Sequence, residues 1–296
     1  MELSLPAHSL PFLLAYVLLL MVGAIMKACR IAQTRLLWLA GLRMSLQLVL
    51  AGFVLTWLFA HPHPLLTCAW LAVMTAFTIR TVLGRHPGLN PRFRFCVAVT
   101  LAACGLLSTF FFVTCIARQN ALNPQYVIPL GGMLMGNAMT GLSLALKSFE
   151  TALDGQRLRI VTLVNLGVRP QRILFPLVRT ALETALLPTL NSMLGMGIVF
   201  LPGMMTGQIL AGAAPATAIL YQGSIMMAIC ATVCLTVLVA LLWGYRSLWD
   251  ADLCIRLPER TPNASLPTGR EKARQHKRSG SRGTAVRLRE PRRTLR

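Results

Sequence analysis

The amino-acid sequence predicts an all-α fold, a polytopic membrane helix bundle with about seven transmembrane helices. Hydrophobic residues make up 55% of the 296 residues, and charged residues make up 13%. The mean hydropathy is +0.62, which is typical of a chain that crosses the bilayer repeatedly and not of a soluble domain. The cations gather in alternate loops between the apolar runs, which is the pattern of a multi-pass membrane protein.

Each predicted span is an apolar run close to the roughly 20 residues that a helix needs to cross the hydrocarbon core. The first run precedes its cations (Lys27, Arg30 and Arg35) and follows no basic segment, so we interpret it as an uncleaved span with the N-terminus outside. In chain order, the predicted spans are 10–26, 38–59, 65–83, 95–117, 126–146, 185–213 and 219–245.

The loops between these spans predict the orientation of the chain. Loops expected inside carry thirteen Lys or Arg residues, whereas loops expected outside carry Arg118 alone. This asymmetry follows the positive-inside rule and places the C-terminus inside. The sequence therefore divides into a transmembrane domain, 1–250, and a basic cytoplasmic tail, 251–296, which we expect to be disordered.

The tail contributes +9 of the net charge of +20, since residues 259–296 hold twelve Lys or Arg against three Glu. No folded module or interleaved aromatic residues accompany this charge, so it does not indicate nucleic-acid binding. We expect the tail to fix the topology and to touch anionic membrane lipid.

The sixth segment, 185–213, is apolar enough for the membrane but contains residues that a plain anchor does not need. Broken helices are tolerated in lipid only beside protein or a water-filled cavity, and they recur at transporter binding sites. The segment therefore favours a transport protein, and it is either one kinked helix or a re-entrant pair. Its pathway candidates are Asn191, Thr206 and Gln208, and its gating or hinge candidates are Pro188, Pro202, Gly203 and Gly207.

Two further spans carry polar residues at helical spacing. Arg43 and Gln47 share one face of the second span, where Arg43 either faces the bundle interior or extends to the cytoplasmic interface. In the fifth span, Gly132 and Gly136 have the spacing that lets a second helix approach closely. Asn137 and Thr140 follow, and we interpret them as pathway lining in preference to simple interhelical hydrogen bonding.

Methionines cluster in the fifth and sixth segments, and the ligands of any metal remain unknown. Thioethers suit copper(I), but they are also flexible packing groups, and we favour packing. The spans contain no carboxylate or histidine cluster for a hard cation, so a metal site here would be weak and transient, as a transport path requires.

The loop 147–184 is the longest one predicted inside, and it is the candidate for coupling to a soluble partner. We expect helices over 148–160 and 170–182, with a break at Gly167 and Pro170. Glu150 and Asp154 are acidic candidates for partner contact. The alternative is a plain amphipathic connector.

The sequence contains no GxxxxGK[ST] phosphate loop, GxSxG or HExxH motif. We therefore expect that this chain is not an enzyme and binds no cofactor.

Three stretches of the sequence resemble the FetB-type ABC transporter permease family. They are the second-span pattern Arg43-x-x-x-Gln47-Leu48, the fifth span 126–146, and the long run 187–215 with Pro-Gly-Met-Met-Thr-Gly-Gln, followed by Tyr221-Gln222. The resemblance covers about residues 26–245 and adds Gln222 to the pathway candidates.

The resemblance implies a permease subunit, multi-pass in the bacterial inner (plasma) membrane. Two copies would pair with two copies of a separate ATP-binding subunit, which would hold ATP and Mg. Members of the family are linked to iron export, metal ion homeostasis and oxidative stress resistance, and plant relatives to aluminium tolerance. One departure is that the family's Glu-Ala pair in the cytoplasmic loop is replaced here by Val161 and Thr162. The alternative function is an ATP-independent secondary transporter or channel for a small solute or metal.

Overall fold

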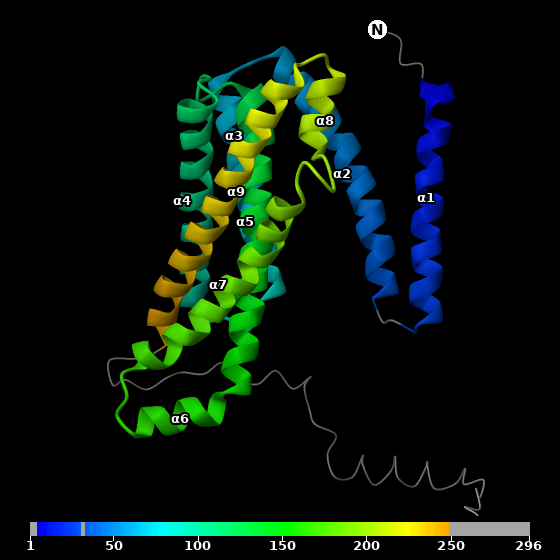
Figure 1. Cartoon of the computed structure of the whole chain (residues 1–296). Coiled ribbons are helices and arrows are strands. Elements are labelled where there is room, and N and C mark those ends of the chain that lie inside the picture. The colour runs from blue at the N-terminus through cyan, green and yellow to red at the C-terminus, as the bar shows by residue number, and fades with distance from the viewer. Residues whose placement is uncertain (1–4, 31–32, 249–296) are drawn as a thin grey trace, which may run out of the picture.

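The computed structural model describes residues 5–30 and 33–248, and these residues form a helical bundle without a β-sheet (Figure 1). The all-α prediction is therefore confirmed. The helices are α1 (Leu5–Ala28), α2 (Thr34–Ala60), α3 (Pro64–Arg85), α4 (Pro91–Phe111), α5 (Pro124–Gly155), α6 (Arg157–Asn165), α7 (Pro170–Gly195), α8 (Gly203–Leu210) and α9 (Pro215–Gly244), with a π-helical turn, η1 (Phe112–Ile116), and a 3₁₀ turn, η2 (Tyr245–Leu248).

Six of the described helices are long and apolar enough to cross a membrane. Five of them correspond to predicted spans, whereas the helix at Gln171–Gly195 overlaps the predicted span 185–213 only over 185–195 and otherwise lies in the predicted loop 147–184. The first predicted span is also helical, as α1, but its apolar part among the described side chains, Tyr16–Ala28, is shorter. The count of about seven and the orientation of the chain stay predictions. The basic tail, 251–296, lies outside the described residues.

Prolines set the beginnings of the helices. Proline occupies the first turn of α3, α4, α5, α7 and α9, where its missing N–H costs no helical hydrogen bond. At α5, the Asn123 side chain also accepts a hydrogen bond from the Gln125 backbone N–H at 3.1 Å, which caps the helix. Local sequence therefore fixes where these helices start.

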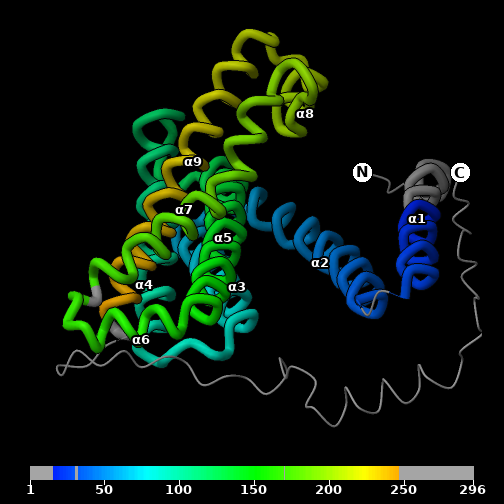
Figure 2. The backbone as a smooth tube through the Cα atoms, turned by 60° about the horizontal axis from the view of Figure 1, so that its bottom comes forward, coloured from blue at the N-terminus to red at the C-terminus, as the bar shows by residue number. Residues whose placement is uncertain are grey.

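Helix α5 lies at the centre of the bundle, where it contacts α3, α4, α7 and α9 (Figure 1). Its interior side chains, such as Leu134, Leu142 and Phe149, are almost fully buried. The α1–α2 pair lies to one side of this bundle in both Figure 1 and Figure 2, and most of the side chains of α2 are exposed. The apolar face of α2 is therefore left for lipid or a partner to cover.

The predicted break in the sixth segment is confirmed. Helix α7 ends at Gly195, and α8 begins at Gly203 after a short irregular connection. Gly197, with φ +84°, donates its N–H to the Phe200 carbonyl at 3.0 Å and closes a tight turn that only glycine adopts without strain. The segment is thus two separate helices, not one kinked helix, and α8 packs against α9.

The predicted cytoplasmic loop has different boundaries in the structure. Residues 147–155 continue α5, and Pro170 opens a helix that runs on to Gly195, so the connection between α5 and α7 is 156–169, which contains α6. The expected helix over 148–160 is divided at Gln156, where the backbone leaves helical geometry. The expected break is confirmed, since Gly167 has φ +76° and α7 begins at Pro170.

Candidate transport pathway

A small hollow lies between α5 and α7, with α9 at its back, and it brings together residues that the sequence singled out. Its volume is about 80 Å³, which is enough for a few water molecules, since one water needs about 10–15 Å³ by the same measure. Three of the predicted residues, Asn137, Thr140 and Pro188, line it together with Gly141, Leu144, Ala185, Thr189, Ser192 and Met226.

Three polar side chains of the hollow each donate one hydrogen bond within their own helices. Asn137 Nδ2 donates to the Met133 carbonyl at 2.8 Å, Thr140 Oγ1 donates to the Gly136 carbonyl at 3.0 Å, and Ser192 Oγ donates to the Pro188 carbonyl at 2.9 Å. The Asn137 carbonyl oxygen and the lone pairs of both hydroxyls remain as acceptors, and the second Nδ2 hydrogen of Asn137 remains as a donor. The hollow therefore offers neutral oxygen ligands, which suit a hydrated or hard cation held weakly.

Helix α9 adds a buried acceptor near this hollow. Gln222 is 4% exposed, and its Oε1 has no hydrogen-bond partner among the described residues. It precedes Met226, a lining residue, by one helical turn and so shares its face of α9. An unpaired buried carbonyl costs about 1–3 kcal/mol, so this position favours water or a passing polar ligand.

The other pathway candidates of the sixth segment lie outside the hollow. Asn191 is exposed on α7 beside Ser192. On α8, Thr206 is exposed and donates to the Pro202 carbonyl at 3.2 Å, while Gln208 is half-buried. The polar residues of α8 therefore do not line the hollow that residues of α7 line.

The hinge candidates occupy three different settings. Pro188 lies inside α7 and lines the hollow. Pro202 caps α8 and Gly203 is its first residue, so both lie at the break. Gly207 is within α8, where an added side chain would meet nothing within 4 Å.

Arg43 and Gln47 are both exposed on α2, away from the hollow. The Arg43 guanidinium lies over the Phe77 ring of α3, 5.4 Å from the ring centroid, which is a cation–π contact. In the described chain, Arg43 thus joins α2 to α3.

The closest helix contact of α5 is not at the two glycines whose spacing predicted one. An added Cβ at Gly132 would lie 3.3 Å from Met74 Cε, and one at Gly136 would meet nothing within 4 Å. The tight crossing is at Gly141, where an added Cβ would lie 2.6 Å from Val233 Cγ1. Within the described chain no other helix packs closely on Gly136, so the prediction for this glycine stays a prediction.

The partner-coupling candidates gather at the opposite end of α5 from Asn123. Glu150 Oε2 is 3.1 Å from Nδ1 of His86, which is buried at the end of α3. Asp154 is exposed in the last turn of α5, and Gly167 and Pro170 shape the turn between α6 and α7. This contact joins the end of α3 to the part of α5 that leads into α6.

Sequence reasoning missed His86 and the lining residues Thr189, Ser192 and Met226. His86 and Glu150 are 64 residues apart, and no local pattern connects them. Ser192 shared a signal with Asn137, since each is a polar residue that follows a proline or glycine within an apolar helix, but only the contact between α5 and α7 places it in the hollow.

The methionine interpretation stays a prediction. Met135 is 2% exposed and accepts a contact from Thr75 Oγ1 at 3.7 Å, which fits packing. Among the described residues, no group of three or more His, Cys, Asp or Glu residues could hold a metal ion.

Comparisons with known proteins agree on one family. The model of the uncharacterised protein family UPF0014 matches residues 10–249. The UPF0014 membrane protein slr1647 of Synechocystis is 35% identical over 220 residues, which is 73% of this chain and 83% of the relative. FetB of Escherichia coli, named as a probable iron export permease, is 29% identical over 242 residues, or 80% and 92% of the two chains.

A plant protein is also similar. ALUMINUM SENSITIVE 3 of Arabidopsis thaliana is 31% identical over 188 residues, which is 62% of this chain and 66% of the relative. No solved structure matches the chain.

Proposed function

The chain belongs to the UPF0014 membrane protein family, and from that premise we propose that it is the membrane-spanning permease subunit of an ATP-binding cassette transporter. Its cargo is iron or another metal ion, exported across the bacterial inner membrane. The name of the FetB relative supports iron as the cargo. The proposal includes a role in metal ion homeostasis and in resistance to oxidative stress.

The observation that carries the transport role is the hollow beside the interrupted helix. Asn137 and Thr140 of α5 face Thr189 and Ser192 of α7 across it, and Pro188 interrupts the hydrogen bonding of α7 at that level. Neutral oxygen acceptors bind a cation loosely enough to release it. A plain scaffold has no use for such a group of residues in lipid.

Pairing of two copies would enclose the polar side chains of α5 that border the hollow. Asn137 and Thr140 are exposed in one copy, and polar groups facing lipid are costly. A homodimer that buries this face would make these two side chains part of the wall of a central path. Two copies of a separate ATP-binding subunit would supply the energy, with ATP and Mg bound there and not in this chain.

Movement of the ATP-binding subunits would reach the path through α6. This helix connects α5 and α7, the two helices that form the hollow. A push on α6 therefore acts on both walls of the hollow at once.

The test is purification of the tagged chain from its native membrane in mild detergent, followed by an ATPase assay and transport in vesicles. We expect an ATP-binding subunit to co-purify and ATP hydrolysis to depend on it, with stimulation by the exported metal. A chain that purifies without such a subunit, and that transports fully without ATP, would replace this proposal with a secondary transporter or channel.

A further inference from the structure

Two histidines lie in the short connection between α2 and α3, at the end of the bundle away from α6 (Figure 1). The connection is His61-Pro62-His63, between Ala60, the last residue of α2, and Pro64, the first residue of α3. Both histidines are exposed. Residues i and i+2 of an extended chain lie on the same side of it, so this spacing allows two imidazoles to reach one ion.

The backbone and the prolines place the two imidazoles on one side. His61, with φ −125° and ψ 72°, leads the chain out of α2, and His63, with φ −113° and ψ 129°, is extended. Pro62 and Pro64 both line a hollow of about 630 Å³ formed with residues 120–125, whereas neither histidine lines it. The side chains therefore alternate, and the histidines share the side away from this hollow. Proline also restricts the backbone, so the connection has little freedom to lose when an ion binds.

The ring of His61 is already held in the form that binds a metal. Its Nδ1 lies 3.2 Å from the Trp57 carbonyl oxygen, and a carbonyl only accepts, so Nδ1 carries the proton in this contact. In the neutral ring, Nε2 then has the free lone pair. The Trp57 ring lies beside the imidazole, with 5.4 Å between the ring centroids. Metal-binding histidines commonly donate their other ring N–H to such a carbonyl, which sets the tautomer and the orientation.

His63 is anchored through its backbone, which leaves its ring available. Its carbonyl accepts hydrogen bonds from the backbone N–H groups of Leu66 and Thr67 at 3.1 and 3.2 Å, and its side chain does not cap α3. The position of its Cα is therefore fixed by the first turn of α3, while the exposed imidazole can turn toward His61.

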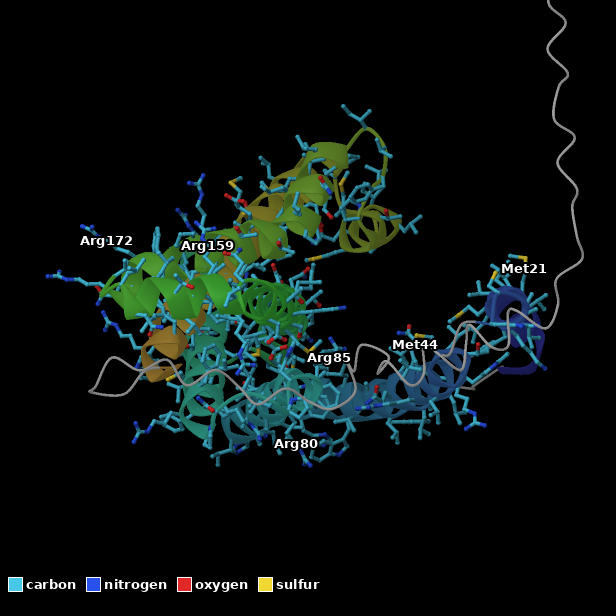
Figure 3. All side chains as sticks on the ribbon, turned by 90° about the horizontal axis from the view of Figure 1, so that it is seen from below. Met21, Met44, Arg80, Arg85, Arg159 and Arg172 are labelled. Carbon is cyan, nitrogen blue, oxygen red and sulfur yellow. The ribbon has the colours of Figure 1, made fainter. Side chains whose placement is uncertain are left out.

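The charges near this connection favour a cation that prefers nitrogen to carboxylate oxygen. Figure 3 views the molecule from the opposite end and labels four arginines there: Arg80, Arg85, Arg159 and Arg172. The connections at the histidine end, 61–63, 117–123 and 211–214, contain one Lys or Arg, Arg118, and no Asp or Glu. Mg²⁺ and Ca²⁺ bind through carboxylates and other oxygens, whereas imidazole suits Fe²⁺, Ni²⁺, Cu²⁺ and Zn²⁺.

We propose that His61 and His63 form a two-imidazole site for a divalent transition metal ion of this nitrogen-preferring class. Water completes the coordination, because the described residues contain no group of three or more His, Cys, Asp or Glu that could hold a metal. Zinc sites use three or four protein ligands, so two ligands hold the ion weakly and exchangeably. The inference goes beyond the proposed function, since the site binds the ion without ATP or a second subunit. The orientation predicted from the loop charges puts it on the outer side of the membrane.

Metal binding by the purified full-length chain tests the site. The chain carries a tag without histidine, and Ni²⁺ binding is measured by equilibrium dialysis in mild detergent. We expect His61→Ala and His63→Ala each to lower the affinity for Ni²⁺ at least about tenfold, because even the loss of a residue that only orients a ligand costs about 10–100-fold. The matched control, His276→Ala, removes a histidine from the basic tail and should bind as wild type. Mg²⁺ should not compete.

Copper(II) supplies a second readout, because the nitrogen splitting in its electron paramagnetic resonance spectrum reports how many imidazoles are bound. We expect two imidazole nitrogens in the wild-type chain and one in either single variant. Since both side chains are exposed, the variants should keep the wild-type helicity.

Three results would overturn the inference. They are wild-type affinity in both single variants, a loss in one of them alone, and an equal loss in His276→Ala. None of these results involves ATP or a second subunit, so each would leave the proposed function standing. Conversely, a chain that purifies without an ATP-binding subunit can still bind Ni²⁺ at this site.

Discussion

Gly141 lines the hollow at the point where α5 meets both α7 and α9. In Gly141→Ala, the new Cβ would lie 2.6 Å from Val233 Cγ1 and 3.7 Å from the Ala185 carbonyl oxygen. Cβ contacts under 3.0 Å are essentially absent from real proteins, so a neighbour must move. Val233 cannot rotate cheaply, because a β-branched side chain in a helix has one strongly preferred rotamer. The helices must therefore shift apart.

The magnitude follows from two opposing terms. Overpacking of a core costs about 1–3 kcal/mol, and replacing glycine by alanine in a helix returns about 0.8–1.0 kcal/mol. We expect Gly141→Ala to lower the free energy of unfolding by about 1 kcal/mol. The matched control is Gly136→Ala on the same helix, where an added Cβ meets nothing within 4 Å, so it should be neutral or stabilising by up to about 1 kcal/mol.

The assay is loss of helicity on titration of the purified chain from mild detergent into SDS. Val233→Ala removes the opposing methyl group, so the double variant should recover part of the loss, with a coupling energy of about 0.5–3 kcal/mol. Gly141→Ala that is as stable as Gly136→Ala would refute the reasoning. So would a loss that Val233→Ala leaves unchanged.

Three other variants test the pathway, the contact between His86 and Glu150, and the coupling turn. Asn137→Leu removes an acceptor from the hollow and should lower ATP-dependent transport about tenfold, the equivalent of about 1.4 kcal/mol; an equal loss in Asn191→Leu, outside the hollow, would contradict this assignment. His86→Ala should cost about 1.5–3 kcal/mol of unfolding free energy, and its effect should not add to that of Glu150→Gln; simple additivity of the two would argue against the pair. Gly167→Trp forces a side chain onto a backbone with φ +76°, and it should abolish transport while membrane insertion, measured by fractionation, stays intact; normal transport would remove the coupling role.

The sequence was sufficient for most of the helices and for where several of them begin. Hydropathy and helix-starting prolines are local properties, so a run such as 219–245 could be predicted as the helix observed at Pro215–Gly244. The break between Gly195 and Gly203 could also be predicted, because proline and glycine act on their own backbone. The end of α5 could not, since residues 147–155 are polar enough to suggest a loop but are held in the helix by the burial of Phe149 and Leu153.

The candidate site was predicted in part. Asn137 and Thr140 stand out in sequence because polar residues are rare in apolar spans, and both line the hollow. Asn191, Thr206 and Gln208 carry the same signal and lie elsewhere, because a polar residue in a span does not indicate which neighbour it faces.

Composition and local pattern thus establish a multi-pass helical membrane protein with an interrupted sixth segment and a basic face, because hydropathy, charge and backbone restrictions act on each residue separately. The packing of helices distant in the chain assigns the rest. It places Ser192 across from Asn137, joins His86 to Glu150 across 64 residues, and turns Leu158 outward on α6. Those contacts depend on how side-chain shapes fit between helices, and that fit has no counterpart in the order of residues along one helix.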